Sequence, residues 1–343
     1  MTTAYLTDDS FTKHNFPQHP EHAGRIEAVW QELRIAGLSD QLLRIAPTPA
    51  TDEQILAVHT ADHLQRLVDV ARGDRMVRLD PDTYALPASL EVARLAAGAV
   101  VGAVDAVLSA RASNAMAIVR PPGHHATADR QMGFCLLNNI AIAARQAQSQ
   151  PGIEKVLILD YDVHHGNGTN DIFYADPSVM FISIHQYPFY PGSGSIDEIG
   201  TGEGIGHTIN IPLPGGHGDT TYLKLFSSVV LPAIERFSPD LMLISAGFDA
   251  HWADPLASMQ LTLAGYDQLA RECIQLAERH CAGRIVFVME GGYDLTALAQ
   301  GWSNIARALL GQDEIRDPYG SPRTPVASVV QPPVDDLRRI HGL

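Results

Sequence analysis

Cysteine is scarce in this chain of 343 residues, which has three copies and no pair in a CxxC spacing. Cys135, Cys273 and Cys281 therefore predict no disulfide framework. They are typical of reduced, mostly buried thiols. We accordingly expect a cytoplasmic protein.

Long apolar runs and basic stretches are also missing. The hydrophobic runs are short and broken by Gly and Pro, so we expect no segment that spans a bilayer. Residues 1–9 have neither a basic start nor a long apolar centre, which argues against a secretory signal. With 24 basic and 39 acidic residues the net charge is −15. This balance predicts no nucleic-acid or membrane partner, but it leaves cationic substrates open.

Strand-like and helix-like segments alternate along the chain, without a linker or a repeat. We expect strands at 4–7, 115–119, 156–159, 179–184, 207–212, 241–245 and 285–289, and helices at 24–36, 60–72, 88–111, 137–149, 168–175, 219–237, 262–280 and 295–310. This pattern predicts one α/β domain over residues 1–312, with a mostly parallel sheet flanked by helices on both faces. Residues 313–343 are polar and Pro-rich, so we expect a tail that is poorly ordered or serves in assembly, including a homo-oligomer.

Three polar residues follow the apolar run at 156–159 in register. Side chains on a strand alternate between faces, so Asp160, Asp162 and His164 point the same way. Two carboxylates on one buried face repel each other and are costly to desolvate, which predicts a divalent metal between them. Asp and His ligands suit Zn²⁺ and Fe²⁺ alike. The alternative is a solvated acidic patch, which explains three polar residues in register less well.

Unusual residues also follow three other expected strands, at 120–125, 246–251 and 290–294. In parallel sheets the carboxyl ends of the strands meet at one edge, where ligands bind. A catalytic metal typically has three protein ligands and an open position. Asp249 is the best third ligand, ahead of Asp254, which lies further into its loop. Asp160 can support a neighbour or bind a second ion.

Metal-assisted hydrolysis also needs a base, an acid and a donor for the developing oxyanion. The adjacent pair His124 and His125 follows the rigid Pro121–Pro122, and each neutral imidazole needs an acceptor to fix its tautomer. Asp160 and Asn167 are candidates for these acceptors. Tyr293, after two glycines, is the candidate oxyanion donor. A packed loop tyrosine is the alternative.

Loop residues around these strand ends are candidates for a substrate channel. Phe134 and Tyr190 can form the walls of a narrow apolar slot, although core packing is the commoner role of aromatics. The histidines of the N-terminal loop, His14, His19 and His22, carry no such pattern. We expect most of them to be solvated.

Five motifs together resemble the zinc-dependent histone deacetylase superfamily, which includes bacterial amidohydrolases and acetylpolyamine deacetylases. The motifs are RPPGHH at 120–125, GFC at 133–135, DYDVHHGNG at 160–168, SAGFD at 245–249 and EGGY at 290–293. The resemblance runs in order over about residues 5–310. Asn138, Asn139 and Asn167 resemble the class II branch.

The resemblance implies an arginase-like fold with a single, mostly parallel, eight-stranded sheet. It implies zinc on three ligands: Asp162, His164 and Asp249. His125 would be the general base and also the acid toward the leaving amine. His124, paired with Asp160, would act as an electrostatic partner, and Tyr293 would stabilise the tetrahedral intermediate.

The resemblance also implies bound potassium and a shaped channel. A structural potassium would be held by Asp160, Asp162, His164, Ser183 and Ile184, and a second by Phe173, Asp176, Val179 and His207. Arg25 matches a family arginine that lines an internal channel for acetate exit. The substrate would contact Asp82, Gly133, Phe134, Tyr190 and Leu256, with Asp82 clamping its backbone.

Two positions depart from the family pattern. Tyr190 stands where the family has a second channel phenylalanine, so the wall gains a hydroxyl group. Leu256 stands where vertebrate-type polyamine deacetylases carry a glutamate gatekeeper, which weakens a polyamine reading. Our leading hypothesis is therefore an amidohydrolase that removes acetyl or short acyl groups, foremost from acetyl-lysine in peptides or proteins. The alternatives are an acetylpolyamine or small acylated-metabolite deacetylase and, from another class, an acyl-lysine binding module without turnover.

Overall fold

The computed structural model describes residues 2–322 and 331–343. Its centre is an eight-stranded sheet with the order β2-β1-β5-β10-β9-β6-β7-β8, in which every pairing is parallel. The strands are β1 (Thr3–Leu6), β2 (Leu43–Ile45), β5 (Asn114–Ala117), β6 (Val156–Asp160), β7 (Val179–Gln186), β8 (Thr208–Leu213), β9 (Leu241–Ala246) and β10 (Ile285–Met289). Strands β3 (Val77–Arg78) and β4 (Tyr84–Ala85) form a small separate hairpin. The expected single parallel sheet is confirmed.

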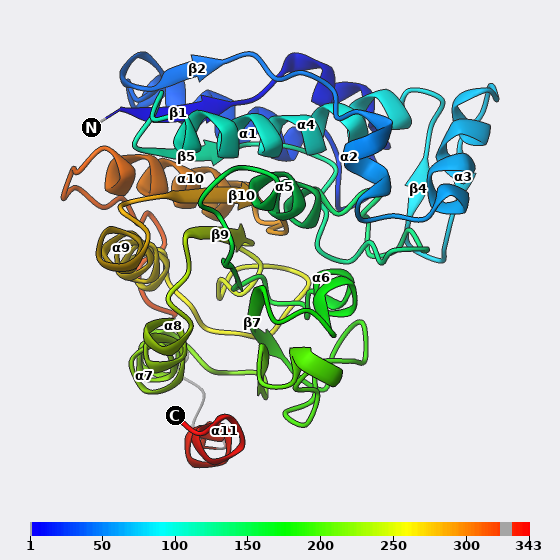
Figure 1. Ribbon diagram of the computed structural model, residues 1–343. Coiled ribbons are helices and arrows are strands. Elements are labelled where there is room, and N and C mark those ends of the chain that lie inside the picture. The colour runs from blue at the N-terminus through cyan, green and yellow to red at the C-terminus, as the bar shows by residue number, and fades with distance from the viewer. Residues whose placement is uncertain (1, 323–330) are drawn as a thin grey trace.

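Helices cover both faces of this sheet. One layer contains α1 (Gly24–Ile35), α10 (Leu295–Leu309), α9 (Leu263–His280) and α7 (Asp219–Leu225), each packed on the next. The other contains α4 (Ser89–Leu108), α5 (Asn139–Gln148) and α6 (Asn167–Phe173), with α2 (Asp52–Leu56) and α3 (Ala61–Ala71) beside them. In Figure 1 the sheet runs from β2 at the top to β7 below, and β7 lies between α7 and α8 (Leu231–Phe237) on the left and α6 on the right. Because both faces are covered, strands such as β6, β9 and β10 are buried along their whole length.

The structure differs from the sequence expectation in a few elements. The helix expected at 219–237 is divided by a π-helical turn at Phe226–Val230, which separates α7 from α8. The short edge strand β2 and the helix α11 (Val334–His341) were not predicted. All three cysteines are buried and unpaired, as expected. Within the described residues, no helix is long and apolar enough to cross a membrane.

The described parts of the C-terminal segment contact the domain. The Tyr319 hydroxyl donates to the Asp294 carboxylate at 2.9 Å, and the Trp252 indole donates to the carbonyl oxygen of Gly320 at 2.9 Å. Helix α11 packs beside the π-helical turn with Leu337 fully buried (Figure 1). Residues 323–330 of the expected tail lie outside the described residues.

Candidate active site

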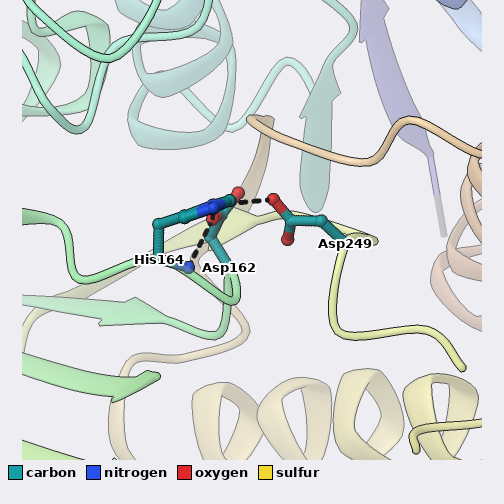
Figure 2. A group of neighbouring side chains, drawn as sticks. All are labelled: Asp162, His164 and Asp249. Atoms are coloured by element: carbon teal, nitrogen blue, oxygen red, sulfur yellow. Dashed lines mark hydrogen bonds and ion pairs between the residues drawn. The ribbon is translucent and has the colours of Figure 1, made fainter. Parts of the chain in front are cut away.

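The three candidate metal ligands come together at the carboxyl ends of two neighbouring strands. Asp162 and His164 follow β6, Asp249 follows β9, and these strands pair directly. Their ligand atoms all lie within 4.8 Å of one another. His164 Nδ1 is 3.3 Å from Asp162 Oδ1 and 3.1 Å from Asp249 Oδ2. Figure 2 shows the three side chains turned toward a common point.

Backbone N–H groups hold the two carboxylates in place. Asp162 Oδ2 accepts from Gly291 N at 2.8 Å, and Asp249 Oδ1 accepts from Val163 N at 2.9 Å. A Cβ atom at Gly291 would lie 2.2 Å from Asp249 Oδ2, so only glycine fits there. The remaining oxygens face His164. Two fully buried carboxylates beside an imidazole nitrogen form a donor set that fits a divalent ion such as zinc.

The adjacent histidines have different partners. His124 Nδ1 lies 2.9 Å from Asp160 Oδ2, and His125 Nδ1 lies 2.8 Å from Asn167 Oδ1. Burial lowers the pKa of His124, but Asp160 and Asp162 outweigh burial and raise it to about 10. For His125, burial and then the positive His124 hold the pKa well below its usual value. His125 is therefore neutral, donates from Nδ1 to Asn167, and keeps a lone pair on Nε2.

Two further carboxylates anchor the loops that carry these groups. The buried side chain of Glu290 accepts from the backbone N–H groups of Gly123 and His124, at 2.8 and 3.2 Å. Asp254 Oδ2 accepts from Tyr293 N at 2.7 Å and from Asp294 N at 3.2 Å. Asp254, the lower-ranked ligand candidate, is thus outside the metal group and holds the Tyr293 loop instead.

A narrow cavity of about 70 Å³ leads to the metal group. It is lined by all five predicted substrate-binding residues together with the histidines and the tyrosine: Asp82, His125, Gly133, Phe134, His164, Tyr190, Leu256 and Tyr293. A Cβ atom on Gly133 would lie 2.3 Å from the His125 ring, so only glycine permits this approach. Phe134 itself has a φ of +68°, a strained conformation that presents its ring to the cavity.

Aromatic rings lie around His164 and His125. The Tyr190 ring meets the His125 ring edge-on at 5.2 Å, and its buried hydroxyl has no partner among the described residues. Phe189 stacks on the His164 ring, with centroids 5.4 Å apart. Phe189 was not predicted as a site residue. Its position next to Tyr190, between two prolines of the long loop, was the available signal.

The two proposed potassium sets differ in their distance from the metal group, because the first set shares Asp162 and His164 with it. Asp160 pairs with Ser183 across β6 and β7, so the first set gathers at one strand end. In the second set, the Asp176 carboxylate is already paired with Arg145 at 2.6 Å. The Arg145 guanidinium also lies 4.6 Å from the centre of the Phe173 ring. This positive charge leaves mainly main-chain oxygens for a second cation.

The expectation of solvated histidines in the N-terminal loop is wrong for His14. Its side chain is buried, with Nδ1 2.6 Å from Ser89 Oγ and the ring stacked on Tyr84. His19 is partly buried and packs edge-on against Phe134, with centroids 4.6 Å apart. The loop therefore lies behind the wall of the cavity. The polar sequence did not reveal this role, because Ser89, Tyr84 and Phe134 are distant from the loop in the chain.

Comparison with known proteins gives a consistent result. A family model described as "Histone deacetylase domain" matches residues 19–309. The chain is 44% identical over 281 residues to a histone deacetylase-like amidohydrolase of Pseudomonas aeruginosa, covering 80% of this chain and 72% of that protein. It is 38% identical to a probable deacetylase of Archaeoglobus fulgidus, over 100% of this chain and 98% of that protein. A crystal structure of the HDA15 HD domain superposes with a TM-score of 0.90 at 37% identity, covering 99% of this chain and 94% of that one. The chain belongs to the histone deacetylase family.

Proposed function

We propose that this protein is a zinc-dependent deacetylase whose main substrates are acetyl-lysine side chains of peptides or proteins. One observation carries the proposal. His164 of the buried Asp-His-Asp group, the neutral His125 and Tyr293 all line one narrow cavity at the carboxyl edge of the sheet. A binding module without turnover has no need of this whole set.

Asp162, His164 and Asp249 are the residues that would hold the metal. Zinc bound there would supply Lewis acidity toward the amide carbonyl and toward water. The backbone N–H groups of Val163 and Gly291 orient the two carboxylates toward the ring of His164.

The residues of the chain supply the proton transfers. His125 is neutral, so its Nε2 can take a proton from the attacking water, and Asn167 holds the tautomer that this role needs. The same nitrogen can then return the proton to the leaving amine. The charged pair of His124 and Asp160 provides a positive ring 4.0 Å from the His125 ring centre. Burial raises the pKa of Tyr293 well above its usual value, so its hydroxyl remains a donor for the developing oxyanion.

The shape of the cavity favours a slender acylated chain. Phe134, Tyr190 and Leu256 provide apolar walls, and Asp82 contributes the carboxylate among the lining residues. Leu256 is uncharged, so it cannot form an ion pair with the cationic nitrogen of a polyamine bound in the cavity. This supports acetyl-lysine ahead of acetylpolyamines.

The test is turnover by purified, zinc-reconstituted protein and by two variants. We expect His125→Ala and Tyr293→Phe each to lower kcat by at least about 100-fold, because each removes one group that acts on the reacting atoms. Circular dichroism and the unfolding temperature should stay near those of the wild type. Normal rates in both variants would contradict the assignment of this cavity as the active site of a deacetylase.

Competition among acyl substrates addresses the rival specificity. An acetyl-lysine peptide, its trifluoroacetyl analogue, acetylputrescine and acetylspermidine would be offered side by side. Preference for the peptide supports the proposal. Preference for the polyamines would instead identify the protein as an acetylpolyamine deacetylase. Absence of any turnover with zinc bound would favour the binding module.

We also propose a structural potassium at the end of β6, near Asp160, Asp162 and His164. The pairing of Asp160 with Ser183 in the sheet supports this location, because it brings main-chain oxygens of β7 beside the acidic group. Comparing unfolding temperatures in KCl and in tetramethylammonium chloride at equal ionic strength would test it.

A further inference from the structure

A buried ion cluster lies behind the cavity, and its centre is Glu21. This residue and its partners Arg25 and Arg120 are all fully buried. Glu21 forms a two-pronged bond with Arg120, from Nε to Oε1 and from Nη2 to Oε2, each 2.7 Å long. Its Oε1 is also 3.4 Å from Nη1 of Arg25. One carboxylate thus serves two guanidinium groups.

Arg25 connects this cluster to the loop that carries Tyr293. Its Nε donates to the carbonyl oxygen of Gly292 at 2.8 Å, and its Nη2 donates to the carbonyl oxygen of Glu290. The guanidinium carbon lies 4.9 Å from the centre of the Tyr293 ring. Arg25 therefore holds the backbone just before Tyr293 and faces the ring itself.

Arg120 connects the cluster to the loop that carries the two histidines. It stands four residues before His124, at the point where the loop leaves β5. Its Nη1 donates to the carbonyl oxygens of Phe11 and His14, so the start of this loop is tied to the N-terminal segment. Glu290 then joins the histidine loop to the tyrosine loop through the Gly123 and His124 N–H groups.

The electrostatics require the shared carboxylate. Two buried guanidinium groups without a counterion would repel each other, and each would lose the partner that compensates for its desolvation. Burial alone would raise the pKa of Glu21, but Arg120 and Arg25 outweigh burial and lower it to about 2. Glu21 is therefore ionised wherever the protein is folded and active.

We propose that Glu21 is a positioning residue, which holds Arg25 against the Tyr293 loop and Arg120 at the base of the histidine loop. It thereby maintains the spacing between the oxyanion donor and the general base. This inference rests on the proposed function. Glu21 touches no reacting atom and acts only through the two arginines.

The experiment compares Glu21→Gln, which keeps the shape and removes the charge, with the matched control Glu27→Gln on the exposed face of α1. Steady-state kinetics on the acetyl-lysine peptide, zinc content and hydrogen–deuterium exchange would be measured for each. We expect Glu21→Gln to lower kcat by about 10- to 100-fold with KM within about twofold, since small displacements of catalytic groups act mainly on kcat. Exchange should rise at 120–125 and 290–294, and Glu27→Gln should match the wild type.

Other outcomes are distinguishable. Unchanged kcat in Glu21→Gln, or faster exchange spread evenly over the domain, would overturn the proposal and leave Glu21 a merely structural residue. If Glu21→Gln does not fold, Glu21→Asp would be used, because it keeps the charge but shortens the side chain. We then expect a smaller loss of kcat and a smaller rise in exchange at 120–125 and 290–294. A wild-type protein without turnover would instead refute the proposed function, while the exchange data would still decide whether Glu21 holds the two loops.

Discussion

Asp162 accepts from the backbone N–H groups of Gly291 and His164, and Asp249 accepts from that of Val163. Each carboxylate also turns one oxygen toward the His164 ring. The ligand oxygens and Nδ1 lie within 4.8 Å of one another in a buried environment, where like charges repel strongly. The negative charge of Asp162 acts in the same direction as burial to raise the pKa of Asp249. A cation bound between the two carboxylates would relieve this repulsion.

This charge balance predicts that zinc stabilises the fold. Adding zinc at about 100 times its Kd should raise the free energy of unfolding by about 2.7 kcal/mol, because the metal binds the native state only. Calorimetric scans with chelator and with zinc would measure the change. The Asp249→Asn variant should lose most of this shift, whereas Asp62→Asn on the exposed face of α3 should keep it. An equal shift in both variants would contradict the assignment of Asp249 as a ligand.

At the scale of elements, α4 packs against the backbone of residues 48–50 so closely at Gly98 that no larger residue would fit there. A Cβ atom on Gly98 would lie 1.8 Å from the carbonyl oxygen of Thr48, which is backbone and cannot rotate away. Alanine is otherwise the better helix former by about 1 kcal/mol. The close contact between α4 and the segment before α2 therefore depends on this glycine.

We expect Gly98→Ala to destabilise the protein by about 1–3 kcal/mol despite its higher helix propensity, because overpacking displaces the backbone. Urea unfolding would measure the change. Gly102→Ala on the same helix is the control, since its Cβ atom would meet only the tip of the Leu6 side chain, at 3.0 Å. Greater stability of Gly98→Ala would show that the two segments can separate at little cost.

The junction between α3 and the histidine loop is a second element-scale feature. His59, just before α3, lies with Nδ1 2.9 Å from the carbonyl oxygen of Thr127 and accepts at Nε2 from Asn138 N at 2.9 Å. This arrangement requires a neutral ring. Burial, followed by the neighbouring His63, lowers the pKa of His59 to about 3.

This lowered pKa predicts acid sensitivity with a definite sign. Between pH 6.5 and about 3 the unfolded chain binds a proton at His59 that the native state does not, so stability is complete above pH 6.5 and declines as the pH falls. In His59→Gln, which can also donate and accept, this loss is absent. The stability advantage of the wild type should therefore shrink by roughly 1.4 kcal/mol per pH unit below 6.5. Parallel urea curves at pH 7 and pH 5 would check it, and a constant gap would contradict it.

At the scale of the whole molecule, the C-terminal segment contacts two of the loops that carry site residues, those after β9 and β10. Trp252 follows Asp249 by three positions and bonds to Gly320, while Asp294 follows Tyr293 and bonds to Tyr319. Residues 1–312 contain every proposed catalytic group. The segment after residue 312 is positioned to restrict the motion of the loops that carry Asp249 and Tyr293.

We expect a chain shortened to residues 1–312 to fold and to bind zinc, but with a lower unfolding temperature and a reduced kcat. The physical reason is the loss of the Trp252 and Asp294 contacts and the exposure of the apolar surface under Leu337. Differential scanning calorimetry and peptide turnover would measure both effects. Full activity and stability of the shortened chain would show that residues 313–343 contribute neither to the fold nor to catalysis.

Most of the fold and the candidate site could be predicted without coordinates. The sequence by itself determined the alternating elements, because runs such as 156–159 have a local pattern that buried parallel strands require. It also determined the proposed ligands and the pairs His124–Asp160 and His125–Asn167, since strand periodicity and the common edge of a parallel sheet constrain where they lie.

Only the tertiary structure decided which polar residues support this site. Glu21 and His14 look like parts of a solvated loop, and Asp254 looks like a spare ligand, until their partners are known. Most of those partners are distant in the chain: Arg120 lies 99 positions from Glu21, and Ser89 lies 75 positions from His14. No local pattern encodes such contacts, because the burial of a charge depends on every element packed around it.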